Sequence, residues 1–240
     1  MTDYDWRLVD LYDGDNPDGP DHDFYRALAD EVGAHSVVDL GCGTGILTVT
    51  LASAGRTVVG VDPSASMLAY AQRRAGASAV DWCLGDSRTI PSGPIDFAVM
   101  TGNVVQHITE TDWLRTLRDL RTALREGGTL AFESRNPATR SWRSWASEER
   151  SMRKTAHGTL IEWSEAEEIA PGAVKLVSHN LFTESNETVT STLVLYFRDR
   201  SDLEHQLNAA GFEVEAVYGD WERGPITDAS AVMVFVATAR

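Results

Sequence analysis

A glycine-rich loop follows an acidic residue in the run 37–45, VVDLGCGTG. Glycine at alternate positions lets the backbone turn sharply, and it lets a ligand approach the main chain without meeting a Cβ. The apolar residues before the loop predict a short strand, and residues 46–52 (ILTVTLA) predict a helix. Strand, loop and helix together predict the first crossover unit of a doubly wound sheet, with a nucleotide-type cofactor at the loop.

The spacing of the glycines separates two classes of cofactor. The dinucleotide fingerprint is G-x-G-x-x-G, whereas Gly41, Gly43 and Gly45 place the third glycine one residue early. A pyrophosphate at a helix N-terminus is also disfavoured by a neighbouring negative charge, which Asp39 supplies. The pattern therefore favours a ligand that carries an ammonium and a sulfonium. Residues 39–45 resemble, position by position, the first motif of the class I (Rossmann-like) S-adenosylmethionine-dependent methyltransferases of small-molecule type.

The resemblance implies a cofactor site spread over several strand ends. Asp62 closes a second apolar stretch, residues 57–61, where an acidic side chain can accept both ribose hydroxyls. In the family the residues after this aspartate pack on the adenine, with Met67 as the apolar candidate. Asp86 follows a third expected strand, 79–84, and is placed to accept from the adenine 6-amino group. The candidate cofactor-binding residues are Tyr12, Asp39, Gly41, Cys42, Gly43, Asp62, Pro63, Met67, Gly85, Asp86, Ser87, Thr101, Gly102 and Asn103.

A fourth expected strand, 95–100, opens into a loop that should border the transferred methyl group, because these strand ends face the ligand crevice. Nucleobase amino methyltransferases carry an Asn/Asp-Pro-Pro-aromatic signature at this point, and this chain has Thr-Gly-Asn-Val. His107 is the first candidate for a general base, since its ordinary pKa suits proton transfer near neutrality. A structural role for His107 stays open, because an acceptor that arrives as a neutral amine needs no base.

The remaining pattern predicts an α/β fold with a doubly wound, seven-stranded, mostly parallel sheet and an antiparallel last strand. A helix over 113–124 precedes a fifth strand at 129–133, and a helix over 201–210 precedes strands at 212–217 and 231–237. Between residues 135 and 198 the runs 160–169, 174–183 and 188–197 alternate in part, which predicts a small antiparallel lid inserted after the fifth strand. We expect a single methyltransferase domain over 1–240, with an acidic N-terminal cap at 1–31 and an inserted substrate lid at 135–198.

Four residues near the start of the insertion are candidates for binding the acceptor: Arg135, Asn136, Trp142 and Trp145. We expect the two tryptophans to lie in a helix, although aromatic residues in such an insertion can also simply pack. The N-terminal segment has two interpretations. It folds over the bound cofactor, or it is a solvated acidic tail.

The composition limits the classes of binding partner that we expect. The chain has 36 acidic and 21 basic residues, for a formal net charge of −15, which repels phosphate backbones and argues against nucleic acid. No apolar run approaches the roughly 20 residues of a membrane span, and the acidic start fits neither a signal nor a transit peptide. Two cysteines in separate elements imply no disulfide framework, and no cluster has metal-ligand spacing. We expect a cytoplasmic enzyme with no metal, and its oligomeric state, a homodimer included, stays open.

The sequence thus predicts methyl transfer from S-adenosylmethionine to a nitrogen or oxygen of a small molecule, with S-adenosylhomocysteine as product. Two alternatives remain at this point. A nicotinamide-dependent oxidoreductase shares the strand and glycine loop, and a non-catalytic S-adenosylmethionine-binding module shares the whole cofactor site.

Overall fold

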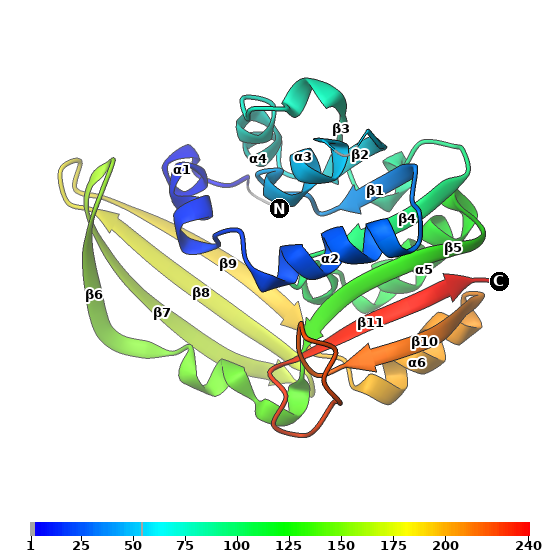
Figure 1. Cartoon of the computed structure of the whole chain (residues 1–240). Coiled ribbons are helices and arrows are strands. Elements are labelled where there is room, and N and C mark those ends of the chain that lie inside the picture. Colours follow the sequence, from blue (N-terminus) through cyan, green and yellow to red (C-terminus); the bar gives the residue numbers. More distant parts are fainter. Residues whose placement is uncertain (1–2, 54) are drawn as a thin grey trace.

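A computed structural model describes residues 3–53 and 55–240 of the chain. Its larger sheet has seven strands in the order β10-β11-β5-β4-β1-β2-β3 (Figure 1). Strands β3, β2, β1, β4 and β5 run parallel, and β11 runs antiparallel to both β5 and β10. The strands are β1 (Ser36–Leu40), β2 (Thr57–Asp62), β3 (Val80–Leu84), β4 (Ile95–Met100), β5 (Leu124–Arg135), β10 (Phe212–Tyr218) and β11 (Val232–Ala239). The predicted seven-stranded sheet with an antiparallel last strand is confirmed.

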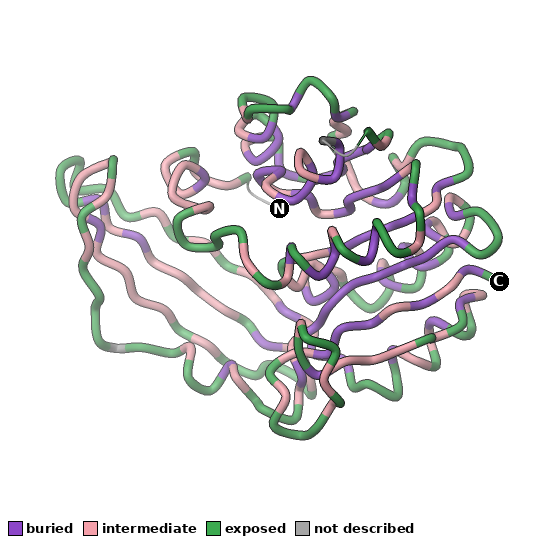
Figure 2. Tube along the Cα trace, viewed as in Figure 1, coloured by how far each residue is buried: buried purple, intermediate pink, exposed green. Residues whose placement is uncertain are grey.

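Helices cover both faces of this sheet, so its central strands are mainly apolar, with the acids Asp39, Asp96 and Glu133 as exceptions. Figure 2 shows these strands buried and the surrounding loops exposed. On one face α5 (Glu110–Ala123) and α6 (Arg200–Ala209) contribute Trp113 and Leu207 to the larger core cluster. On the other face α2 (Pro20–Glu31) and α3 (Ile46–Ser53) contribute Tyr25 and Leu51 to a second cluster. The short helix α4 (Ala65–Ala71) follows β2.

The inserted lid is a four-stranded antiparallel sheet in the order β6-β7-β8-β9. Its strands are β6 (Ser147–Thr155), β7 (Gly158–Ala170), β8 (Ala173–Phe182) and β9 (Glu187–Tyr196). The last three match the predicted runs closely. Strand β6 was not predicted, because its sequence SEERSMRKT has no apolar alternation. The expected helix around Trp142 and Trp145 is wrong: two 3-10 turns, η4 (Pro137–Thr139) and η5 (Ser141–Ser144), occupy this stretch.

The N-terminal segment forms two helices and is no solvated tail over its described residues. The first, α1 (Trp6–Asp15), begins after Asp5, whose side chain accepts from the N–H of Arg7. In Figure 1 it lies between the lid and the larger sheet. The guanidinium of Arg7 lies over the Phe182 ring of the lid, 4.2 Å from the centroid, and Arg153 of β6 forms an ion pair with Asp15. In the described part of the chain no helix is long and apolar enough to cross a membrane.

Candidate active site

The glycine loop joins β1 to α3, and all three of its glycines have positive φ: 81° at Gly41, 53° at Gly43 and 75° at Gly45. A Cβ at Gly41 would collide with the Val104 side chain, and one at Gly45 would collide with Trp82. A Cβ at Gly43 would meet no atom within 4 Å. Two of the glycines therefore serve packing, while Gly43 exposes its backbone to open space in which a ligand can lie.

Asp62 lies beside this loop at the end of β2. Its carboxylate accepts from the backbone N–H of Gly43 at 2.9 Å and from that of Ser64 at 2.8 Å. Burial raises the pKa of Asp62 above its ordinary value. A carboxylate has about four lone-pair positions, so two remain for hydroxyl donors of a ligand. This geometry fits the ribose diol that the sequence assigns to Asp62.

Asp39 occupies β1 directly before the loop and is buried. One carboxylate oxygen accepts from the Thr48 hydroxyl at 2.6 Å, and the other has no hydrogen-bond partner among the described residues. Burial raises the pKa of Asp39 to about 6. A buried carboxylate oxygen without a donor is costly, so the site favours a donor from water or from a cationic ligand.

The predicted adenine side is more fully engaged by the protein itself. Met67 is buried in α4, so little of its side chain is exposed for an adenine to pack on. The Asp86 carboxylate, however, is paired with Arg88 at 2.6 Å and Arg115 at 3.3 Å, and its bonds with Arg88 lower its pKa. A Cβ at Gly85 would collide with Thr89. Asp86 can accept from an adenine amino group only by sharing its carboxylate with two arginines.

Three further members of the predicted cofactor set occupy ordinary positions. Ser87 is buried and donates to Asp119 at 2.5 Å. Cys42 is buried, which raises the pKa of its thiol, and Pro63 is exposed. The Ser87 hydroxyl is already used, the Cys42 thiol is buried and Pro63 has no polar side-chain atom. These side chains therefore give no sign of a ligand contact.

The loop after β4 is held by a residue that the sequence analysis did not identify. Asn103 has a left-handed backbone, with φ at 60°, and its N–H donates to the buried carboxylate of Glu133 at 2.5 Å. The Tyr25 hydroxyl donates to the same carboxylate at 2.5 Å. Burial raises the pKa of Glu133 to about 7. The signal was present in the sequence, since Glu133 is an acid inside the apolar run LAFES of β5 and buried carboxylates are rare.

Gly102 and Thr101 complete this loop. Gly102 has φ at 68° and open space where a Cβ would be, so it resembles Gly43 in leaving its backbone accessible. Thr101 is half-buried. Both residues lie at the end of β4, next to β1 in the sheet, where the sequence predicts the transferred group.

His107 and Arg135 lie close together beyond these loops. His107 ends the 3-10 turn η3 (Val104–His107), and burial together with the Arg135 charge lowers its pKa to about 4. Arg135 ends β5, donates to the Gln106 side chain at 2.8 Å, and lies over the Trp145 ring at 5.1 Å. Burial raises the pKa of Tyr12 to about 12, and the charges that act on this hydroxyl include those of Asp62 and Arg135. The site therefore brings Tyr12, His107, Arg135 and Trp145 together.

Two other predicted acceptor residues have structural roles. The Asn136 side chain is buried, accepts from the Ala138 N–H and donates to the Thr227 carbonyl, both at 3.1 Å. Trp142 is buried against Phe197, with ring centroids 4.4 Å apart. The polar groups of Asn136 and the ring of Trp142 are thus used within the protein.

The N-terminal segment contacts the cofactor loops directly. Asp13 accepts from the Thr44 hydroxyl at 2.6 Å and forms an ion pair with Arg74. Asp3 accepts from the Ser64 hydroxyl at 2.5 Å. These acidic residues, which the sequence offered only as a charged segment, fix α1 beside the glycine loop and the residues that follow Asp62.

Four of the nine buried side-chain polar atoms without a hydrogen-bond partner in the described residues lie at neighbouring strands of the larger sheet. They are Asp39 Oδ1 at β1, Asn103 Oδ1 and Gln106 Nε2 after β4, and Ser134 Oγ in β5. Native proteins satisfy nearly all such atoms with protein or ordered water. These four atoms are therefore available to polar groups bound beside β1, β4 and β5.

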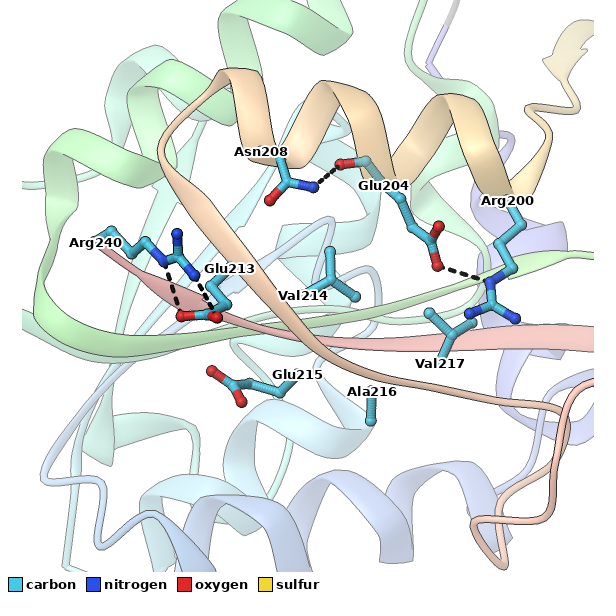
Figure 3. Close-up of a pocket in the computed structure, with 9 residues that line it drawn as sticks. All are labelled: Arg200, Glu204, Asn208, Glu213, Val214, Glu215, Ala216, Val217 and Arg240. Carbon is cyan, nitrogen blue, oxygen red and sulfur yellow. Dashed lines mark hydrogen bonds and ion pairs between the residues drawn. The ribbon is translucent and has the colours of Figure 1, made fainter.

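The recess in Figure 3 lies elsewhere, between α6 and β10 at the far end of the strand order. Four of its five charged side chains form two ion pairs, Arg240 with Glu213 and Arg200 with Glu204, and Glu215 forms no ion pair with the described residues. The candidate site lies instead at the carboxyl ends of β1, β2, β4 and β5.

Comparison with known proteins bears on the family and the fold. Residues 37–128 match the methyltransferase domain family. The chain is 36% identical over 117 residues, 48% of its length, to the ubiquinone/menaquinone biosynthesis C-methyltransferase UbiE of Rubrivivax gelatinosus, of which the match covers 45%. The chain thus spans about half the length of the curated relatives that it matches.

Two solved structures share the fold over nearly the whole chain. The CcbJ methyltransferase from Streptomyces caelestis superposes with a TM-score of 0.78 at 22% identity, over 99% of this chain and 100% of that one. The sugar N-methyltransferase KedS8 from Streptoalloteichus superposes with a TM-score of 0.79 at 22% identity, over 100% of this chain and 96% of that one. Residues 37–128 therefore match the methyltransferase domain family, and the whole chain shares the fold of these two solved methyltransferase structures.

Proposed function

We propose that the protein transfers a methyl group from S-adenosylmethionine to a nitrogen or oxygen of a small molecule and releases S-adenosylhomocysteine. The observation that carries the proposal is the pairing of Gly43 with Asp62. An accessible backbone with positive φ lies beside a carboxylate that has two positions left for hydroxyl donors. This arrangement suits an adenosine ribose, whereas the carboxylates of Asp39 and Asp62 beside the loop disfavour a pyrophosphate.

The bound cofactor supplies an electrophilic methyl group on a sulfonium. The protein's own residues bind and orient the two reactants. Asp62 would accept from the ribose hydroxyls, and the unpartnered oxygen of Asp39 offers an acceptor for a cationic donor. Correct placement of donor and acceptor can supply much of the acceleration of such a displacement.

The acceptor would lie above β4 and β5, under the lid. The lid face that meets α1 carries small polar residues beside its apolar ones, with Ser164, Ser178 and Asn180 along β7 and β8. Phe182 lies on the same face under Arg7. Hydroxyl and amide groups on this face suit a hydroxylated acceptor, and the name of KedS8, a sugar N-methyltransferase, supports an amino sugar as the class to test first.

His107 can act in two ways. Because its pKa is lowered to about 4, the imidazole is neutral near pH 7 and can accept a hydrogen bond from the acceptor. The same low pKa makes it a weak base, so little driving force exists for full proton removal from an alcohol. This balance favours nitrogen over oxygen as the methylated atom. A neutral amine attacks without prior loss of a proton.

Calorimetric titration tests the cofactor assignment. We expect S-adenosylhomocysteine to bind, and NAD and NADP to give no heat at the same concentrations. Tighter binding of NAD would overturn the proposal in favour of an oxidoreductase. With the cofactor established, methyl transfer from labelled S-adenosylmethionine is measured across amino sugars, simple amines, phenols and hydroxylated sugars. Binding without transfer to any acceptor would instead indicate a non-catalytic cofactor-binding module.

A further inference from the structure

Arg135 is a partly buried cation that has no carboxylate partner among the described residues. Its guanidinium donates once, to the Gln106 side chain at 2.8 Å, and its flat face lies over Trp145 at 5.1 Å. No acidic oxygen of the described chain lies within 4.0 Å of it. A guanidinium has five N–H donors, so most of the fork is left for another group.

The other arginines of the described chain behave differently. Those that are buried or half-buried are paired with a carboxylate, as Arg198 is with Glu110 and Arg74 with Asp13. Those without a carboxylate partner, Arg118, Arg140, Arg143 and Arg150, are exposed to water. Removal of a charge from water is expensive unless an opposite charge replaces the hydration. Arg135 is partly removed from water, but no carboxylate of the described chain pairs with it as one does with the other half-buried arginines.

No neighbouring acid of the described chain forms an ion pair with Arg135. Glu133 is two residues away on β5, but its carboxylate accepts from Tyr25 and from the Asn103 N–H, and its pKa is raised to about 7. The Tyr12 hydroxyl stays neutral because its pKa is raised to about 12. Burial lowers the pKa of Arg135, although the nearby Glu133 charge acts in the opposite direction. The guanidinium therefore has an acid in its surroundings but no carboxylate of the described chain in direct contact.

The backbone of Arg135 is separated from the glycine loop and from Asp62. It ends β5, whereas the glycine loop follows β1 and Asp62 ends β2, so β4 lies between Arg135 and the loop. Neighbouring strands are about 4.8 Å apart, and β5 runs beyond Phe132, which pairs with the last residue of β4, so the end of β5 is at least roughly 10 Å from that of β1 and at least roughly 14 Å from that of β2. Arg135 thus belongs to the acceptor side of the site, next to His107 and below Trp145.

We propose that Arg135 binds a carboxylate carried by the acceptor, an inference that rests on the proposed function. Gln106 and Trp145 hold the guanidinium from one edge and one face, so the remaining N–H groups present a fixed fork. Such a fork matches the two oxygens of a carboxylate, which a lysine ammonium does not do. The acceptor is then a small molecule with both a methylated nitrogen or oxygen and an acidic group.

The first experiment measures anion binding without any need for turnover. Acetate is titrated into protein saturated with S-adenosylhomocysteine, and backbone and arginine side-chain NMR signals are followed. We expect a saturable shift in the wild type and an affinity at least tenfold weaker in Arg135→Gln, because a charge-assisted pair is lost. Arg143→Gln is the matched control, since Arg143 is an exposed arginine without a carboxylate on the same segment. Equal acetate binding by wild type and Arg135→Gln overturns the proposal.

A second variant places a negatively charged side chain of the protein itself next to Arg135. Gln106→Glu keeps the shape of the side chain and places a carboxylate where the amide now accepts from Arg135. We expect this variant to fold, to be at least as stable as the wild type, and to bind acetate at least tenfold more weakly. Retained acetate binding in Gln106→Glu would contradict the proposal even if Arg135→Gln failed to fold.

A third measurement tests whether the carboxylate belongs to the cofactor instead. S-adenosylhomocysteine and its analogue without the carboxyl group are titrated into wild type and Arg135→Gln. If Arg135 serves the acceptor, the substitution changes both affinities by less than about twofold. If Arg135 binds the cofactor carboxylate, the substitution selectively weakens S-adenosylhomocysteine, and the proposal is wrong. Failure of S-adenosylhomocysteine to bind the wild type would refute the proposed function itself, which is a separate result.

Discussion

Glu133 gives a sharp test of how the site is held together. The carboxylate is buried in β5 and receives hydrogen bonds from the Tyr25 hydroxyl and the Asn103 N–H, which position the loop after β4. Burial raises its pKa from 4.5 to about 7. A carboxyl group whose pKa is raised on folding stabilises the protein fully below its unfolded pKa. That contribution is lost as the pH rises through the folded value.

The size of this effect follows from the two pKa values. At ~1.36 kcal/mol per pKa unit, the difference between 4.5 and about 7 corresponds to a loss of about 3 kcal/mol in the free energy of unfolding. Urea denaturation at pH 4.5 to 8 measures this free energy directly. In Glu133→Gln the side chain no longer titrates, while its carbonyl oxygen can still accept from Asn103. We expect the stability of the variant relative to the wild type to rise by about 3 kcal/mol across this range.

When the variant is compared with the wild type, the contributions of groups that titrate in both proteins cancel. Asp39, whose pKa is raised to about 6, also weakens the wild type as the pH rises, but it does so equally in Glu133→Gln. Glu126→Gln is the matched control, because Glu126 is an exposed acid on the same strand. Parallel stability curves for wild type and Glu133→Gln would show that the carboxylate is ionised at ordinary cost and would refute the reasoning.

Two other substitutions test the roles that we assign to Asp62 in cofactor binding and to His107 in methyl transfer. Asp62→Ala should weaken S-adenosylhomocysteine by at least about tenfold in calorimetry, because charge-assisted hydrogen bonds are lost, while Asp81→Ala on the exposed face of β3 should leave affinity unchanged. Unchanged affinity in a folded Asp62→Ala protein would contradict the ribose assignment. His107→Ala should slow single-turnover methyl transfer only a few-fold, because the lowered pKa of about 4 makes His107 a weak base, and the rate should show no pH dependence from this group above about pH 5. A loss of roughly 10² to 10⁴ would instead identify His107 as a general base and contradict the preference for a neutral amine.

The sheet could be predicted from the sequence because its strands are short apolar runs that end in glycine or acid. Strand β4 was predicted at its observed bounds, and β2 lacked only Asp62 at its end. Strand β5 starts earlier than predicted, since Arg125 and Glu126 interrupt its apolar pattern before a register shift opposite β4. Strand β6 has too few apolar residues to show any period. It is held by backbone pairing with β7, which no local pattern reports.

Site residues could be predicted from the sequence only where they belong to a motif of residues close together in the chain. The glycine loop and Asp62 lie within a short stretch, so their spacing identified them. The partner of Glu133, in contrast, is Tyr25, 108 residues earlier in the chain. Asp86 was assigned a ligand although Arg115, 29 residues away, shares its carboxylate. Charge pairing between distant elements determines which polar groups are left for ligands, and it becomes visible only in the folded chain.

Charge pairing also explains why the N-terminal segment is acidic. Helix α1 has Asp13 bound to Thr44 and Arg74 beside the glycine loop, and Asp15 bound to Arg153 of the lid. Exposed ion pairs are each worth little, roughly 0 to 1 kcal/mol, so no single contact fixes the helix. Together they attach one short rigid element to both the cofactor loop and the lid.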